Sequence, residues 1–160
     1  AFNEFKSAND ENLKKRDALL EAKIENTSKA LDRFEDVNQK LVLAEQQAKA
    51  HQWLGMVNAD IHSKFSILFG PQRFAESEAA QAEVVAAAKK LLQGLFAAVD
   101  THLNGRKYLA DELTIADVYL LVVLNWAAYK EVDLSACKNL QALHARVVAD
   151  AAVAKVLAQQ

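Results

Sequence analysis

The stretch LTIADVYLLVVLNWAAY, residues 113–129, decides the fold of this chain. Thr114 and Asp117 have the N-cap and N3 spacing of a helix capping box, with Asp in place of the usual Glu, and Leu113 and Val118 stand where a hydrophobic staple has its two residues. After this cap the helix is apolar on nearly every side, and such a helix is buried in the middle of a bundle. We expect Thr114→Ala or Asp117→Ala to cost about 1–2 kcal/mol each.

The composition predicts an all-α fold for the rest of the chain. Hydrophobic residues make up 52% of the 160 residues, which is enough for the core of one domain. The chain has only 4 Gly and 1 Pro, and a sheet-rich fold of this length would need more turn residues. The net charge of −2, without a stripe of Lys and Arg, argues against a nucleic-acid partner.

No segment predicts targeting or metal binding. Residues 1–20 are charged throughout, and the longest apolar run, residues 118–124, is far short of the roughly 20 residues that span a bilayer. We therefore expect a cytoplasmic protein without membrane contact. The single cysteine, Cys137, is interpreted as an ordinary reduced thiol near a helix start. The four histidines lack the spacing of metal ligands, so no metal site is expected.

The first part of the chain predicts an added amphipathic helix, or two, over residues 1–50. No Gly or Pro occurs before Gly55, and apolar residues recur at helical spacing. The apolar stripe consists of Leu13, Leu20, Ile24, Leu31, Phe34 and Leu41. Thr27 and Asn38 fall on the same stripe and dilute it. Two arrangements stay open: the stripe folds back onto the rest of the chain, or it pairs between two chains as a coiled coil.

Four further helices complete a predicted bundle of about five or six, in a single helical domain that spans residues 1–160. One helix should run through residues 53–68 and end before Gly70-Pro71, which is a strong stop signal. A second, over residues 84–103, has a nearly ideal amphipathic face and is closed by Asn104-Gly105. The last two follow the helix of residues 113–129 and are expected at 140–149 and 151–157.

Three segments resemble one known family over about residues 50–157. Residues 106–120, RKYLADELTIADVYL, look like the all-helical C-terminal domain of glutathione transferases, and the bacterial beta class is the most similar. Residues 53–69 resemble the first helix of that domain. Val132-Asp133-Leu134, Asn139-Leu140 and Arg146 stand where the family's penultimate helix would be. Residues 1–50 do not match the family.

The resemblance implies a glutathione site that lies mainly on a second, thioredoxin-like domain, which supplies the catalytic Cys, Ser or Tyr. Residues 1–50 show neither alternating strands nor a cysteine. In beta-class enzymes the helical domain adds a His and a neighbouring Lys; His62 falls on the His position, and Ser63 replaces the Lys. Trp126 matches a family tryptophan near the domain interface. His62 and Trp126 are thus weak candidates for remnants of a glutathione site. No catalytic, cofactor-binding or metal-binding residue is assigned.

Departures from the family pattern lead to a hypothesis about function. Similar proteins tend to have Pro where this chain has Ile67, Lys138 and Ala151, and this loss of prolines looks like helix idealisation. We therefore expect a non-catalytic scaffold, an engineered chimera rather than an enzyme, with no cofactor and no small-molecule substrate. Its partner would be a second copy or another protein, bound through an apolar helical face. The alternatives are a natural protein-binding adaptor and a residual glutathione transferase. The aromatic residues Trp53, Trp126, Tyr119 and Tyr129 are most simply assigned to the core.

Overall fold

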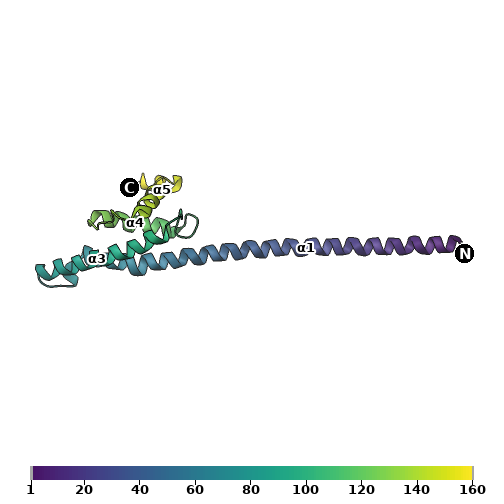
Figure 1. The fold of residues 1–160 in the computed structure, drawn as a ribbon, viewed down its shortest axis with the longest axis horizontal. Coiled ribbons are helices and arrows are strands. Elements are labelled where there is room, and N and C mark those ends of the chain that lie inside the picture. The colour runs from purple at the N-terminus through teal and green to yellow at the C-terminus, as the bar shows by residue number, and fades with distance from the viewer. Residues whose placement is uncertain (1, 160) are drawn as a thin grey trace. The chain divides into compact units, whose positions relative to one another are not determined.

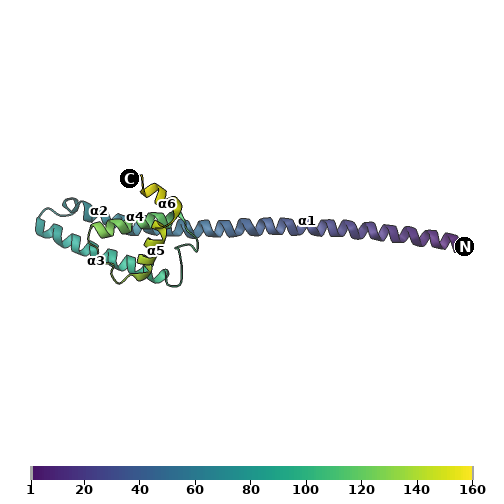
Figure 2. The same cartoon turned by 90° about the horizontal axis from the view of Figure 1, so that it is seen from above.

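The computed structural model describes the backbone of residues 2–159 and the side chains of residues 9–159. These residues form helices and no strand, with one isolated bridge between Ala110 and Glu112, which confirms the all-α prediction. The order is α1 (Phe2–Met56), η1 (Val57–His62), α2 (Ser63–Phe69), η2 (Pro71–Arg73), α3 (Glu78–His102), α4 (Ile115–Tyr129), α5 (Lys138–Val148) and α6 (Ala151–Leu157) (Figures 1 and 2). Within this part of the chain, no helix is long and apolar enough to cross a membrane.

Helix α1 is a single helix of 55 residues, so the choice between one helix and two is resolved in favour of one (Figure 1). The prediction that a separate helix begins near Trp53 is wrong, because α1 continues through Trp53 and Gly55 to Met56. No proline precedes residue 71, and one glycine alone costs a helix only about 1 kcal/mol. By its internal contacts the chain divides into two units, Ala1–Glu45 and Gln46–Gln160.

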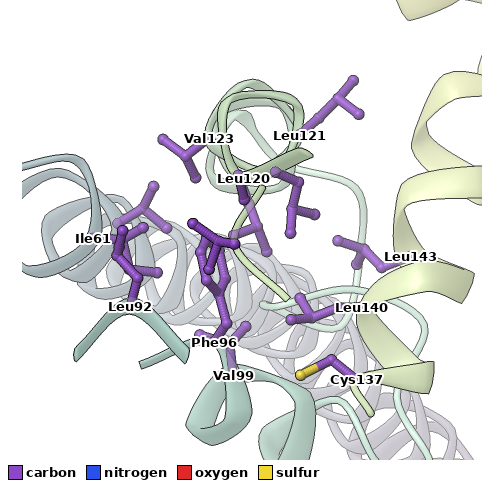
Figure 3. Close-up of a cluster of buried hydrophobic side chains, with 14 of the residues drawn as sticks. Ile61, Leu92, Phe96, Val99, Leu120, Leu121, Val123, Cys137, Leu140 and Leu143 are labelled. Atoms are coloured by element: carbon purple, nitrogen blue, oxygen red, sulfur yellow. The ribbon is translucent and has the colours of Figure 1, made fainter. Parts of the chain in front are cut away.

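The core of the second unit is built from η1, α2, α3, α4 and α5. Figure 3 shows Leu92, Phe96 and Val99 of α3 directed toward the same interior as Leu120 of α4 and Leu140 of α5. Each of these side chains is at most 1% exposed. The spacing of three or four residues along each helix places them on one face, which is the physical origin of the bundle.

Helix α4 is buried along most of its length but not on every side. Ala116, Leu120 and Ala127 are fully buried, whereas Ile115, Val122 and Tyr129 are 61%, 40% and 75% exposed. The exposed three follow each other at intervals of seven residues and therefore share one face of the helix. The expectation of a helix buried all round is wrong for this face, and so is the assignment of Tyr129 to the core.

The start of α4 is fixed by the carboxylate of Asp117, which is fully buried. Its Oδ2 accepts hydrogen bonds from the backbone N–H of Thr114 at 2.9 Å and from the Thr114 hydroxyl at 3.0 Å. Its Oδ1 accepts a third from the backbone N–H of Leu109 at 2.9 Å. Leu113 and Val118 are half-buried against the core. One side chain thus caps the helix and also anchors the loop before it, which sets the position of the α4 residues described next.

Candidate functional site

Three polar side chains meet where η1 packs against α4. η1 is a π-helical segment, a rare conformation that recurs at functional sites, and it carries Asn58 and His62. The Tyr119 hydroxyl donates to Asn58 Oδ1 at 3.0 Å and is also hydrogen-bonded to His62 Nδ1. A hydroxyl has one hydrogen, so His62 Nδ1–H must donate to the Tyr119 oxygen. In the neutral ring, Nε2 of His62 therefore carries the free lone pair.

An aromatic row extends from this cluster along α4 and α2. The His62 ring packs edge-on against Trp126, with ring centroids 4.9 Å apart. Trp126 contacts Phe69 in the same manner at 5.5 Å, and Phe69 stacks on Tyr129 at 6.4 Å. The ammonium group of Lys130 lies 4.6 Å from the centre of the Phe69 ring. Phe69 and Tyr129 are 48% and 75% exposed, so part of this aromatic row is open to solvent.

An apolar groove of about 500 Å³ adjoins the aromatic row at Trp126. It lies between α4 and α6, and its volume falls within the range of small-molecule sites. Its lining residues are Val118, Leu121, Val122, Asn125, Trp126, Ala152, Val153, Val156 and Leu157. Trp126 therefore contacts His62 and also forms part of the groove wall. A polar cluster and an apolar groove that share one indole ring can hold a ligand with a polar and an apolar part.

A second cavity, of about 290 Å³, contains the only cysteine. Cys137 is 6% exposed at the N-cap position of α5. Burial raises the pKa of its thiol, and the carboxylates of Asp100 and Asp133 raise it further. The charge around this thiol outweighs any effect of the helix start, so Cys137 is not an activated nucleophile.

The structure also shows the contacts of Ser63, which stands where the family has a lysine. Ser63 donates to the carbonyl of Ala59 at 2.6 Å and accepts from the ammonium of Lys64 at 3.2 Å, so a cation stands one residue beyond the family position. Among residues with described side chains, no three His, Cys, Asp or Glu gather as metal ligands. Sequence reasoning missed Asn58 and the site role of Tyr119, which it assigned to the core and which does pack half-buried against it. The only available signal was that Asn58 and His62 are four residues apart on one helix.

Residues 52–151 match the family described as glutathione S-transferase, C-terminal domain. The chain belongs to this family, which confirms the resemblance found in the sequence.

Individual relatives agree with this assignment. Glutathione S-transferase GST-4.5 of Xanthomonas campestris pv. campestris is 40% identical over 115 residues, which are 71% of this chain and 56% of that protein. The solved glutathione S-transferase from Xylella fastidiosa is 32% identical with a TM-score of 0.68, covering 71% of this chain and 55% of the other. A sphingomonad glutathione S-transferase complexed with glutathione is 30% identical with a TM-score of 0.61, covering 71% and 54%. The chain thus spans a little over half the length of each relative.

These findings overturn the hypothesis of an engineered, non-catalytic scaffold. The relatives of this chain are named as transferases, so the expectations that it is not an enzyme and has no small-molecule substrate are wrong. The adaptor alternative gains no support from them. The loss of proline has a physical explanation at two of the three positions. Lys138 and Ala151 are the first residues of α5 and α6, a position that favours proline but accepts other residues, so its loss there does not indicate design.

Proposed function

We propose that this domain forms the helical half of the substrate site in a glutathione transferase. The observation that carries the proposal is the orientation of His62: Tyr119 and Asn58 hold its Nδ1 side, and Trp126 packs against its ring. No hydrogen bond within the described residues occupies Nε2, which is therefore the atom that meets a ligand. A ring held by Tyr119 and Trp126 loses little freedom when it binds, which favours affinity.

The thioredoxin-like domain and the helical domain have different roles in the reaction. The glutathione sulfur, as the thiolate, forms a bond to an electrophilic carbon, and the leaving group departs with its electron pair. The family resemblance implies that a thioredoxin-like domain supplies the group that orients the thiol. In this domain we assign to His62 a hydrogen bond that Nε2 accepts from an N–H group of glutathione, which positions the tripeptide for attack.

The groove between α4 and α6 is our proposed binding site for the apolar electrophile. Nearly all its lining side chains are apolar, and Trp126 joins it to His62. Because Val122 is 40% exposed on the groove wall, Val122→Glu should raise the KM for an aromatic electrophile without raising the KM for glutathione. Leu91→Glu is the matched control, since Leu91 is exposed on α3 and does not line the groove.

The proposal is tested by the rate at which the protein conjugates glutathione to 1-chloro-2,4-dinitrobenzene. We expect His62→Ala to lower kcat/KM for glutathione about tenfold, the value of one ligand hydrogen bond. Tyr119→Phe should lower it less, because the His62 ring stays but loses the acceptor that orients it. His51→Ala, which removes an exposed histidine of α1, is the control. If glutathione does not bind to the protein, or if His62→Ala matches His51→Ala, the proposal is wrong.

We also propose that the protein acts in the cytoplasm. Its single cysteine has no partner for an intramolecular disulfide, and a free thiol fits a reducing compartment. Fractionation of cells that produce the tagged protein checks this proposal, and recovery in an extracytoplasmic fraction would contradict it.

A further inference from the structure

The first unit, Ala1–Glu45, presents a row of large apolar side chains to solvent. Their exposed fractions lie between 38% and 68%, far above those of the bundle core. The row consists of Leu13, Leu20, Ile24, Leu31, Phe34 and Leu41. Exposed leucine, isoleucine and phenylalanine side chains in one line along a helix mark an interaction surface.

The spacing of this row is that of a coiled coil. From Leu13 to Leu41 the seam positions alternate by four and three residues without interruption, a repeat of 3.5 residues. With Leu13 at heptad position d, the a positions are Asp17, Ile24, Leu31 and Asn38, and the d positions are Leu13, Leu20, Thr27, Phe34 and Leu41. A helix that packs on a globular core usually has a wider apolar stripe, whereas a narrow a/d seam fits one partner helix.

The charges of the same unit lie where a coiled coil has them. Three intrahelical ion pairs join residues four apart: Lys15 with Glu11 at 2.8 Å, Lys29 with Glu25 at 2.6 Å and Lys40 with Asp36 at 2.7 Å. All six residues occupy positions b, c or f, on the side of the helix away from the seam. The seam therefore stays free of these charges.

The flanking positions fit a second copy of the same segment in parallel orientation. Position g of one helix meets position e of its partner, five residues further on, and these pairs set the choice of partner. Here Arg16 at g would meet Glu21 at e, and Val37 would meet Val42. No g–e pair between residues 16 and 42 brings like charges together. The one unfavourable layer holds Asp17 opposite itself, and Arg16 lies 3.8 Å from that carboxylate.

Asn38 and Thr27 indicate the register. A single Asn at an a position specifies two parallel strands in register, because only then do the two amides face each other. In that register Thr27 also meets Thr27, so the two uncharged polar residues of the seam are matched, and Asp17 is the one polar seam residue that is not. We propose that residues 13–41 form a parallel, in-register, two-stranded coiled coil with the same segment of a second copy of this chain.

The mass of the full chain in solution, measured by sedimentation equilibrium, is the first test. We expect twice the chain mass for the wild type and at least tenfold weaker self-association for Leu31→Lys, which places a charge at a central a position. Leu19→Lys is the matched control, because Leu19 at position c is 64% exposed and Leu31 is 63% exposed. Asp17→Leu should strengthen the dimer. A monomeric wild type, as a fold-back helix would give, or an oligomer unaffected by Leu31→Lys would overturn the proposal.

Disulfide trapping in the full chain tests the register separately. Thr27→Cys should cross-link two chains under mild oxidation, since both residues face each other at a d layer. Asn26→Cys, at position c, should not. The buried Cys137 is present in both variants and serves as an internal reference. Cross-linking through Asn26→Cys but not Thr27→Cys, or through neither, would rule out the parallel in-register pairing.

Discussion

Replacing Asp117 with Ala removes the acceptor of three hydrogen bonds at once. The backbone N–H groups of Leu109 and Thr114 lose their partner, and Leu109 is only 2% exposed, so water cannot replace the carboxylate there. A buried donor left without an acceptor costs about 1–3 kcal/mol, which gives about 2–6 kcal/mol for the two backbone groups together. Thr114→Ala loses the hydroxyl bond at 3.0 Å and the capping contact from the backbone N–H of Asp117, but it leaves the carboxylate in place, and it should cost about 1 kcal/mol. The structure thus makes these two substitutions unequal, whereas the sequence predicted equal costs.

The free energy of unfolding is measured by urea titration with tryptophan fluorescence. Both tryptophans, Trp53 and Trp126, lie in the unit Gln46–Gln160, so this signal follows the unfolding of the bundle alone. Glu112→Ala is the control, because Glu112 is an exposed carboxylate five residues before Asp117. A loss for Asp117→Ala of less than about 0.5 kcal/mol, or one no larger than for Thr114→Ala, would refute the assignment of Asp117 as anchor of both helix and loop.

Three further predictions concern single positions. In the same urea assay, Gly94→Ala in the middle of α3 should stabilise by about 0.5–1 kcal/mol because the added Cβ has open space, whereas Gly105→Ala should destabilise by about 1 kcal/mol because φ is +73°. Iodoacetamide should alkylate Cys137 at least tenfold more slowly in the folded than in the urea-unfolded protein, since burial limits access and raises the thiol pKa; equal rates would contradict this. The Lys49 ammonium, 3.0 Å from Asp111, holds the pKa of that carboxyl below its usual value, so this pair stabilises at neutral pH and the effect is lost as pH falls through the lowered pKa. Lys49→Met should therefore raise the Asp111 pKa in a carbon-13 titration, and an unchanged value would show that another group lowers it.

Features that depend on neighbouring residues could be predicted from the sequence. The scarcity of Gly and Pro indicates helices throughout, and the Thr114–Asp117 spacing locates the start of α4 because a cap is a contact over three residues. The link from Asp117 to Leu109 is a loop contact with no sequence signature. Likewise, periodicity shows that α4 is apolar all round but not that Ile115, Val122 and Tyr129 remain exposed, because exposure depends on what packs against each face.

The candidate site was only partly visible in the sequence for a similar reason. The family resemblance points to His62 and Trp126, but their functional geometry comes from Tyr119, which is 57 residues away from His62 along the chain. Its hydroxyl fixes the tautomer of the imidazole, and nothing in its local sequence distinguishes it from a core tyrosine. The π-helical turn that brings Asn58 into the same cluster is also a tertiary effect, since residues 57–62 read as ordinary α-helix.

The central claim is that the face of α4 bearing Trp126 binds glutathione beside His62. The two tryptophans make the measurement internally controlled, because Trp126 lies against His62 whereas Trp53 packs on His102, with ring centroids 4.2 Å apart. Glutathione titrated into nitrogen-15-labelled protein should shift the indole N–H resonance of Trp126 in a saturable manner and leave that of Trp53 in place, and His62→Ala should abolish the shift. Resonances that stay unmoved at saturating glutathione, or a shift confined to Trp53, would contradict the account.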